Sequence, residues 1–190
     1  MRRHMALKKP HRSKRLPDLS LLDGVVAPGV LDALRAASRQ LATIGVRHAL
    51  VGGLAVGAYG YPRATKDVDF LVGGEAFAHH SGGIVTIAPG VPIQVGGIAV
   101  DPISIAPNEQ YLDAAVAQPD VDAGIPIAPI EALLYLKLRS PRRKDEADIV
   151  ELLKEGVAVA PVRTYLEQVA PDLLDKFDAL AADAIAEEDE

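Results

Sequence analysis

Val51-Gly52-Gly53-Leu54-Ala55-Val56 is followed, after a short gap, by Arg63-Ala64-Thr65-Lys66-Asp67-Val68-Asp69-Phe70-Leu71. The second stretch predicts a strand in which Asp67 and Asp69 point to the same face, with backbones roughly 6.5–7 Å apart. Two like charges on one face of an otherwise apolar strand indicate that a cation or water lies beside them. Mg²⁺ is a hard cation that prefers carboxylate oxygens together with substrate phosphates. The aspartate pair therefore predicts a magnesium site on this strand.

The apolar pattern around this motif predicts a mixed sheet followed by a helical C-terminal part, which is an α+β fold. Val68, Phe70 and Val72 share the face of the aspartate strand that is expected to belong to the core. Short strands are expected at 48–51, 67–72, 84–88, 91–95 and 98–105, with an extended piece at 125–128. Helices are expected at 28–44, 54–59, 108–118, 130–139, 142–154, 162–169 and 171–186.

The length of 190 residues fits one domain, or one domain with a helical appendage. The expected organisation is a basic tail and lead-in over 1–27, partly disordered, an α/β core over 28–128 and a helical region over 129–190. The chain has no cysteine, which excludes a disulfide framework and a thiolate zinc site. No apolar run approaches the roughly 20 residues of a membrane span. The N-terminus lacks the apolar segment of a secretory signal, so a cytoplasmic protein is expected.

Charge is distributed unevenly along the chain. The net charge of -6 argues against a surface that is uniformly built to bind nucleic acid. Residues 1–15 carry a basic run without acids, which would either contact RNA or DNA or remain a solvated tail. The last four residues, Glu187 to Glu190, are all acidic and predict a second disordered end. The basic run consists of Arg2, Arg3, Lys8, Lys9, Arg12, Lys14 and Arg15.

The pattern Gly52-Gly53, then Arg63-x-Thr65-x-Asp67-x-Asp69, resembles the nucleotidyltransferase superfamily related to DNA polymerase β. It is most like the small bacterial AbiEii-type and minimal nucleotidyltransferases, and the resemblance covers roughly residues 45–155. It implies that Asp67 and Asp69 are catalytic and hold Mg²⁺. It also implies that Gly52, Gly53, Arg63 and Thr65 bind the nucleotide. Glycines have no Cβ, so their backbone N–H groups can approach a phosphate closely, and the following helix presents its positive end.

A third carboxylate in that superfamily comes from a later strand. Asp101, in Ile98-Ala99-Val100-Asp101, fits by its position and by its apolar surroundings. By the resemblance it would be a further metal ligand or a general base that activates the acceptor hydroxyl. The alternative is that Asp101 is a turn residue before Pro102.

A second block, Glu131 to Arg139 followed by Arg142-Arg143-Lys144-Asp145-Glu146-Ala147-Asp148, is similar to the AbiEii-type pattern of a helical lysine before a basic-acidic helix. The resemblance implies that Lys137 reaches the nucleotide phosphates and that Asp145 or Asp148 orients Lys137 or the acceptor. Asp148 is therefore included among the nucleotide-binding residues. Five Lys and Arg residues between 137 and 144 would form a local positive patch.

Structural roles compete with these functional ones. Asp67 and Asp69 would otherwise lie on a solvent-facing strand edge, and Arg63 would pair with an acid near its turn. Lys137 would extend from a buried helix to solvent, and Asp145 and Asp148 would form a salt-bridged helix face. His79-His80 is expected in a loop and His48 in a structural role. Tyr59 and Tyr61 would either stack on a base or pack in the core or turn.

The expected function is Mg²⁺-dependent transfer of a nucleoside monophosphate from an NTP to a hydroxyl on RNA, protein or a small molecule. A tRNA or protein acceptor, a cognate toxin or antitoxin partner and an abortive-infection setting follow from the family resemblance. The glycine pair replaces the commoner Gly-Ser, so a hydroxyl contact to phosphate is missing. A catalytically inactive nucleotide-binding or antitoxin-like module is the alternative. A hydrolase or phosphotransferase that uses the same acids is a third possibility.

Overall fold

A six-stranded mixed sheet is the centre of the described part of the chain. The computed structural model describes residues 15–77, 87 and 90–188. The strands are β1 (His48–Val51), β2 (Asp67–Val72), β3 (Ile93–Val95), β4 (Ile98–Ser104), β5 (Asp120–Asp122) and β6 (Ile125–Ile127). Their order in the sheet is β3-β4-β2-β1-β6-β5. The pair β1 and β2 is antiparallel, while β2 pairs with β4, and β1 with β6, in parallel.

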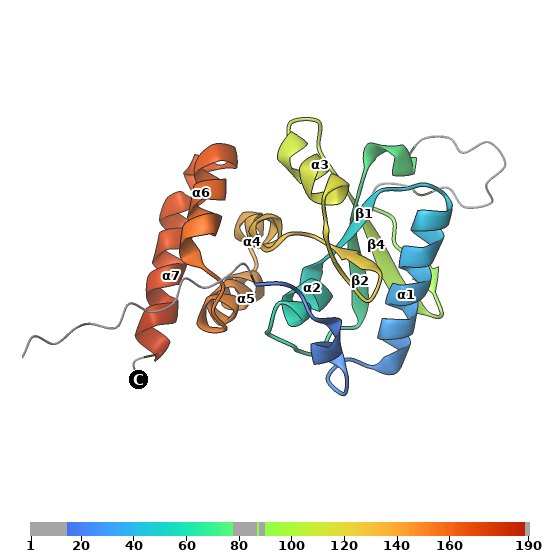
Figure 1. Cartoon of the computed structure of the whole chain (residues 1–190), viewed down its shortest axis with the longest axis horizontal. Helices are drawn as coiled ribbons and strands as arrows, with labels where there is room; N and C mark the ends of the chain where they lie inside the picture. Colours follow the sequence, from blue (N-terminus) through green and yellow to red (C-terminus); the bar gives the residue numbers. More distant parts are fainter. Residues whose placement is uncertain (1–14, 78–86, 88–89, 189–190) are drawn as a thin grey trace, which may run out of the picture.

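Helices flank the sheet and form the C-terminal part, which confirms the predicted α+β fold (Figure 1). The predictions at 48–51, 67–72 and 130–139 match the observed bounds. The α-helices are α1 (Pro28–Thr43), α2 (Gly52–Ala58), α3 (Gln110–Ala117), α4 (Ile130–Arg139), α5 (Arg143–Lys154), α6 (Val159–Val169) and α7 (Leu174–Glu188). Short 3₁₀ turns are η1 (Leu19–Leu22), η2 (Gly74–Phe77) and η3 (Pro171–Leu173).

Helix α1 covers one face of the sheet. Val68, Phe70 and Val72 are fully buried, as the alternation along β2 predicts. The imidazole of His48 packs edge-on against Phe70 and lies 2.9 Å from the Ser38 hydroxyl of α1. Burial lowers the pKa of His48, which suits a neutral ring in a structural role. The helix predicted over 28–44 ends at Thr43, and Ile44 follows it and is 44% exposed.

The opposite face of the sheet carries the aspartates and faces helix α4. Helices α4 and α5 lie between the sheet and the outer pair α6 and α7 (Figure 1). Leu133 and Leu134 of α4 are fully buried, and so is Phe177 of α7. The C-terminal helices therefore share one continuous hydrophobic core with the sheet.

The lead-in segment packs against helix α2 rather than standing apart from the core. Leu22 is fully buried, Val26 is 3% exposed, and the Asp18 amide donates to the Ala58 carbonyl at 2.8 Å. Residues 1–14, the predicted strand at 84–88 except Ile87, the pair His79-His80 and the end of the acidic tail lie outside the described residues. Within the described ranges, no helix has both the length and the apolar character that a membrane crossing requires.

Candidate functional site

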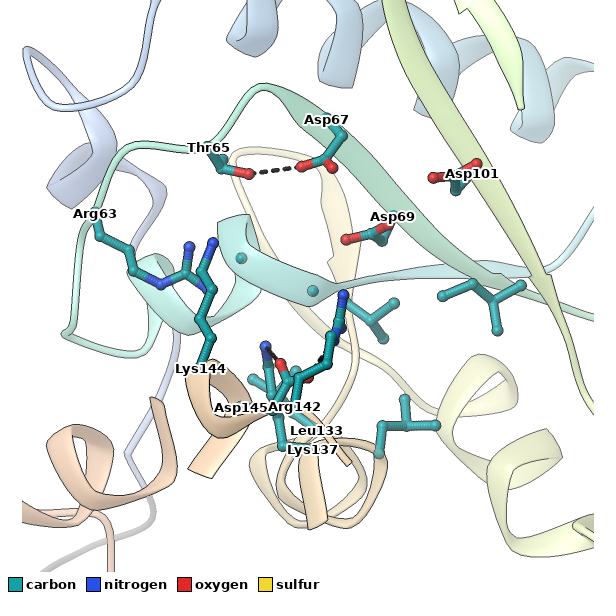
Figure 2. Close-up of a pocket in the computed structure, with 15 residues that line it drawn as sticks. Arg63, Thr65, Asp67, Asp69, Asp101, Leu133, Lys137, Arg142, Lys144 and Asp145 are labelled. Atoms are coloured by element: carbon teal, nitrogen blue, oxygen red, sulfur yellow. Dashed lines mark hydrogen bonds and ion pairs between the residues drawn. The ribbon is translucent and has the colours of Figure 1, made fainter. Parts of the chain in front are cut away.

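The predicted carboxylates lie side by side on one face of the sheet. Strand β2 pairs with β4 so that Asp69 is directly opposite Asp101, and on its other side Asp69 is opposite Val51 of β1. Asp67 is two residues before Asp69 and therefore shares its face. Figure 2 shows the three acids together at one wall of a cavity. The structure thus brings Asp67, Asp69 and Asp101 together from two parallel strands, and Asp101 lies within β4 rather than in a turn.

Asp69 is the most perturbed of these acids. Burial is the main cause that raises its pKa to about 6, and the negative charges of Asp67 and Asp101 raise it further. The positive charges of Lys137 and Arg142 lower the pKa of Asp69, but by less than burial and the two neighbouring acids raise it. A carboxylate in this situation is destabilised unless a cation or a proton joins it, and perturbed acids of this kind are typical of functional sites.

Thr65 orients the first acid. Its hydroxyl donates to Asp67 Oδ1 at 2.7 Å, which leaves the other carboxylate oxygen directed toward the cavity side of the strand (Figure 2). Thr65 also lines the cavity, and its contact with a nucleotide stays a prediction.

The glycine pair begins α2 at the edge of the cavity. Gly52 has a φ of +67°, which is the left-handed region that L side chains rarely adopt, and a Cβ there would overlap the Asp69 carboxylate. A Cβ on Gly53 would lie 3.2 Å from Thr65 Oγ1 and 3.3 Å from Arg63 Nη1. Helix α2 begins at Gly52, earlier than the predicted start at Leu54.

We expect Gly52→Ala to lower stability by about 1–2 kcal/mol from backbone strain alone, and to displace Asp69 as well. Transfer activity should fall at least about 100-fold, because the displaced group is a carboxylate of the acidic wall. Thermal unfolding and initial rates measure the two effects. Gly124→Ala is the matched control, because Gly124 has a φ of +76° with nothing within 4 Å of an added Cβ. It should lose similar stability while keeping its activity, and equal activity losses in both variants would contradict a role for the Gly52 contact.

Cationic side chains form the wall opposite the acids. Arg63 comes from the loop before β2, Lys137 from α4, and Arg142 and Lys144 from the start of α5. Figure 2 shows them across the cavity from the three aspartates. The cavity has a volume of about 280 Å³. One side can thus accept a divalent cation and the other a chain of phosphates.

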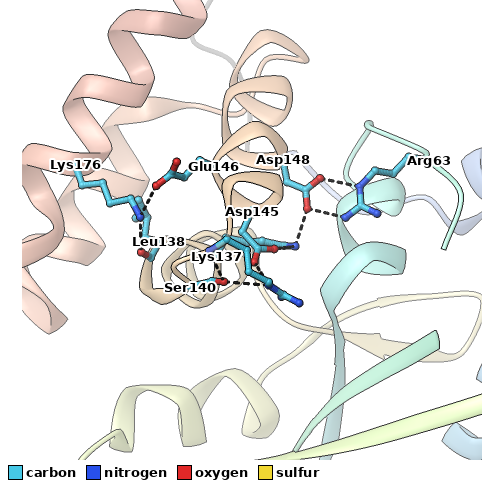
Figure 3. Close-up of polar contacts among 9 residues, drawn as sticks. Arg63, Lys137, Leu138, Ser140, Asp145, Glu146, Asp148 and Lys176 are labelled. Carbon is cyan, nitrogen blue, oxygen red and sulfur yellow. Dashed lines mark hydrogen bonds and ion pairs between the residues drawn. The ribbon is translucent and has the colours of Figure 1, made fainter. Parts of the chain in front are cut away.

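An alternating charge network holds three of these four cations in place, namely Arg63, Lys137 and Arg142 (Figure 3). Arg63 donates Nε and Nη2 to the two oxygens of Asp148, both at 2.7 Å. Lys137 Nζ donates to Asp148 at 2.6 Å and to Asp145 at 2.5 Å. Arg142 Nε completes the network on Asp145 at 2.7 Å. The network therefore joins the loop before β2 to helices α4 and α5.

The acids of this network are ionised despite their burial. Burial alone would raise the pKa of Asp148, but hydrogen bonds from Arg63 and Lys137 outweigh it, so that its pKa lies below the ordinary value. The pKa of Asp145 is lowered in the same way, with Lys137 as the main partner that opposes burial. The side chain of Asp148 is 1% exposed and does not line the cavity. Its place is behind Lys137 and Arg63 rather than on a bound nucleotide.

Arg63 retains an unused donor. Among the buried side-chain atoms of the described residues, its Nη1 lacks a hydrogen-bond partner, and it lies beside Gly53 at the cavity. A buried guanidinium N–H without an acceptor is unfavourable, so the position is suited to an anionic oxygen. Arg63 therefore pairs with an acid, as one prediction had it, and also lies beside the glycine pair, as the other had it.

Sequence reasoning missed the aliphatic part of the cavity. Val51, Ile103, Leu133 and Leu136 line it together with the charged residues. The spacing of Ile103 from Asp101 carries the signal, because residues two apart on a strand share a face. Tyr59, a candidate for base stacking, is fully buried and donates its hydroxyl to Asp120 and to the Ala128 carbonyl. It belongs to the core.

The acidic wall fits a hard cation in its chemistry. Three carboxylates that repel one another around Asp69 are the oxygen donors that Mg²⁺ uses, and Mg²⁺ commonly keeps waters and substrate phosphates among its ligands. In the part of the chain that the structure describes, no three His, Cys, Asp or Glu side chains already converge as a metal cage. The donor set of the wall therefore fits a hard divalent cation that keeps part of its coordination shell for other ligands.

No protein-family model matches this chain, and no curated protein matches its sequence.

Proposed function

We propose that this protein is a Mg²⁺-dependent nucleotidyltransferase with the polymerase-β-like arrangement of its site. The observation that carries the proposal is the cavity with three carboxylates on one wall and four cations on the other. A metal-bound triphosphate carries positive charge on the metal ion and negative charge on its phosphates. The acidic wall would contact the metal ion and the cationic wall the phosphates. The resemblance of Gly52-Gly53 and Arg63-x-Thr65-x-Asp67-x-Asp69 to that superfamily supports the same activity.

Each side chain then has a role in positioning or in charge stabilisation. Asp67 and Asp69 would hold Mg²⁺, which supplies charge neutralisation at the reacting phosphate. Arg63 Nη1 donates to a phosphate oxygen, and Lys137 neutralises the developing charge as a point charge. Gly53 leaves room for the phosphate next to Arg63. No covalent enzyme intermediate is required, as is usual for transfer at phosphorus.

The reaction is a substitution at the α-phosphorus. The acceptor hydroxyl oxygen forms a bond to phosphorus while the bond to the pyrophosphate oxygen breaks, and pyrophosphate leaves with the electron pair. The hydroxyl proton goes to Asp101, which is the carboxylate on β4 beside Asp69. The Asp101 carboxylate returns the proton to solvent after product release.

The acceptor is proposed to be an RNA, with tRNA as the natural test case. Arg142, Arg143 and Lys144 follow one another at the start of α5, and two of them line the cavity. A cluster of cations at the entrance is the electrostatic footprint that a nucleic acid needs. A cytoplasmic location, where NTP, Mg²⁺ and tRNA occur together, and a cognate toxin or antitoxin partner belong to the same proposal.

Incubation with each α-³²P-labelled NTP and Mg²⁺, with and without total tRNA, tests the activity. We expect label on RNA with the wild-type protein and release of pyrophosphate. The Asp67→Asn/Asp69→Asn variant should lose the label by at least about 1000-fold, because several kcal/mol of charge stabilisation are removed. Asp32→Asn is the matched control, because Asp32 is an exposed acid of α1 outside the cavity. It should label RNA like the wild type.

Other outcomes identify other functions. Label on the protein itself would make a protein hydroxyl the acceptor. Tight binding of Mg·NTP without any label would replace the enzyme by a nucleotide-binding module. Release of inorganic phosphate in place of pyrophosphate would indicate a hydrolase or phosphotransferase. Full labelling by the double asparagine variant would refute the proposed site.

A further inference from the structure

The cavity has an aliphatic floor, formed by Val51, Ile103, Leu133 and Leu136. Leu133 is fully buried and Val51 is 2% exposed, so these two close the bottom. Ile103 is 38% exposed and Leu136 is half-buried, so these two keep open surface. These two side chains therefore offer apolar surface to a ligand inside a cavity that is otherwise lined by charged groups.

The Ile103 part of the floor lies away from the glycine pair, whereas Val51 directly precedes Gly52. On β4, Ile103 follows Asp101 by two residues and shares its face, and it pairs with Leu71 rather than with Asp67. Thr65, Gly53 and Arg63 gather around Asp67 at the other end of the acidic wall. Leu133, Leu136 and Lys137 are three and four residues apart on α4 and share one helix face. The cavity thus has a phosphate end and an aliphatic end, with the acids between them.

Most polar side chains of the cavity are already engaged with one another. Apart from Thr65, every polar side chain among the described residues that line the cavity is charged. The Thr65 hydroxyl is donated to Asp67. Three of the four cations across from the acids donate to Asp145 or Asp148. Among the described lining residues, no amide and no unengaged hydroxyl therefore remains for contacts to a base.

We propose that the aliphatic floor holds the nucleoside of the NTP and gives the enzyme little preference among the four bases. This inference rests on the proposed function. With the α-phosphate at Asp67 and Asp69 and the rest of the triphosphate toward the cations, the nucleoside extends toward Ile103 and Leu136, and the acceptor hydroxyl keeps its place at Asp101. Apolar contact discriminates weakly between ligands of similar shape, whereas hydrogen-bonded readout discriminates by about 10⁴–10⁵.

Direct binding measurements with two kinds of ligand test this inference. Isothermal titration in Mg²⁺ gives Kd for α,β-methylene analogues of ATP, GTP, CTP and UTP, and for inorganic tripolyphosphate. We expect the four nucleotide Kd values to lie within about tenfold of one another. Ile103→Ala should weaken all four by a similar factor of about 3–10, since part of the apolar contact is lost. Tripolyphosphate affinity should stay unchanged, which also shows that the variant is folded.

Two further variants support the assignment. Leu136→Ala, on the opposite side of the floor, should show the same pattern as Ile103→Ala. Val121→Ala removes an aliphatic side chain that is 64% exposed on the edge strand β5, outside the cavity, and should change nothing.

The contradicting results are distinct. One nucleotide that binds more than about 100-fold tighter than the others would refute the lack of base readout and leave the proposed function intact. Unchanged nucleotide affinity in both floor variants, with a raised KM for the RNA acceptor, would assign the floor to the acceptor. Failure of tripolyphosphate and of all four nucleotides to bind wild-type protein would overturn the proposed function itself.

Discussion

Replacing Asp69 with asparagine is expected to abolish transfer and, at the same time, to stabilise the metal-free protein. The charge of Asp69 is unfavourable in the folded state, because burial and the neighbouring Asp67 and Asp101 raise its pKa to about 6. An asparagine has nearly the same shape without the charge. The gain follows from about 1.4 kcal/mol per pKa unit and amounts to about 1–3 kcal/mol at neutral pH. Melting temperatures should rise by about 2–4 °C for each kcal/mol.

The pH dependence of this gain has a definite sign. The ordinary pKa of the carboxyl is 3.8 and the folded value is about 6, so the native state binds more protons between these values. Wild-type stability therefore falls as pH rises through this window, and the penalty is complete above it. The variant lacks this titration. The difference in melting temperature should be largest at pH 7–8 and should vanish as pH falls toward 4.

Magnesium should reverse the order of the two proteins. A ligand that binds the native state stabilises it by mass action, so Mg²⁺ with a nucleotide should raise the wild-type melting temperature and leave that of Asp69→Asn almost unchanged. Asp32→Asn again serves as the control and should follow the wild type at every pH. The contrary result is a metal-free Asp69→Asn variant that melts below the wild type at pH 7.5. It would show that the charge of Asp69 does not destabilise the folded protein.

The sheet was predictable where strong local signals bound a short apolar run. The double glycine after Val51 and the pair Gly73-Gly74 after Val72 mark the ends of β1 and β2, and the observed bounds agree with the predicted ones. Pro129 marks the start of α4 in the same way, because proline disfavours a helical residue before it. In these segments the local pattern and the tertiary packing require the same structure.

Strand β5 was missed because its local signal points elsewhere. Asp120-Val121-Asp122 carries two acids in a three-residue strand, a composition that disfavours strands. Its hairpin with β6 turns through Ala123 and Gly124, with φ values of 47° and 76°. Such turns usually contain Asn-Gly or Asp-Gly, so the Ala-Gly sequence does not predict a turn with alanine at a positive φ. Pairing with β6 imposes this strand despite the sequence.

The candidate site was predictable only as far as local spacing reaches. Asp67 and Asp69 share a face by strand geometry alone, and the resemblance added Asp101. The charge network was left open, because Arg63 and Asp148 are distant in sequence and the chain offers many acids as partners. The resemblance offered Asp145 or Asp148 as the partner of Lys137, and in the structure Lys137 donates to both.

Removing Asp148 is expected to cause the largest loss of stability. Asp148→Ala leaves Arg63 without a carboxylate and Lys137 with Asp145 alone, while both cations stay largely buried, with side chains 17% and 7% exposed. Breaking a buried ion pair from one side costs about 3–5 kcal/mol, because an uncompensated charge remains. This corresponds to a melting temperature lower by about 6–20 °C in a protein of this size. Chemical denaturation and thermal unfolding measure the loss.

An exposed pair provides the comparison. Asp178 pairs with Arg163 at 3.2 Å on the surface of α7, and both side chains are more than 40% exposed, at 44% and 42%. Asp178→Ala should cost less than about 1 kcal/mol, since solvent screens such a pair. Similar losses in Asp148→Ala and Asp178→Ala would show that the network contributes no more than a surface contact.

A second variant separates the stability of the network from its role in the site. Asp148→Ala/Lys137→Met removes the charge of Lys137 together with that of its partner Asp148. The double variant should therefore recover part of the stability that Asp148→Ala loses. Transfer activity should not recover, because the cation that faces the phosphates is then missing. Asp148→Ala alone should raise the KM for NTP, since Arg63 and Lys137 lose the group that holds them at the cavity wall. The double variant would thus regain stability without regaining activity, because the charges proposed to bind phosphate are the same charges that are costly to bury when unpaired.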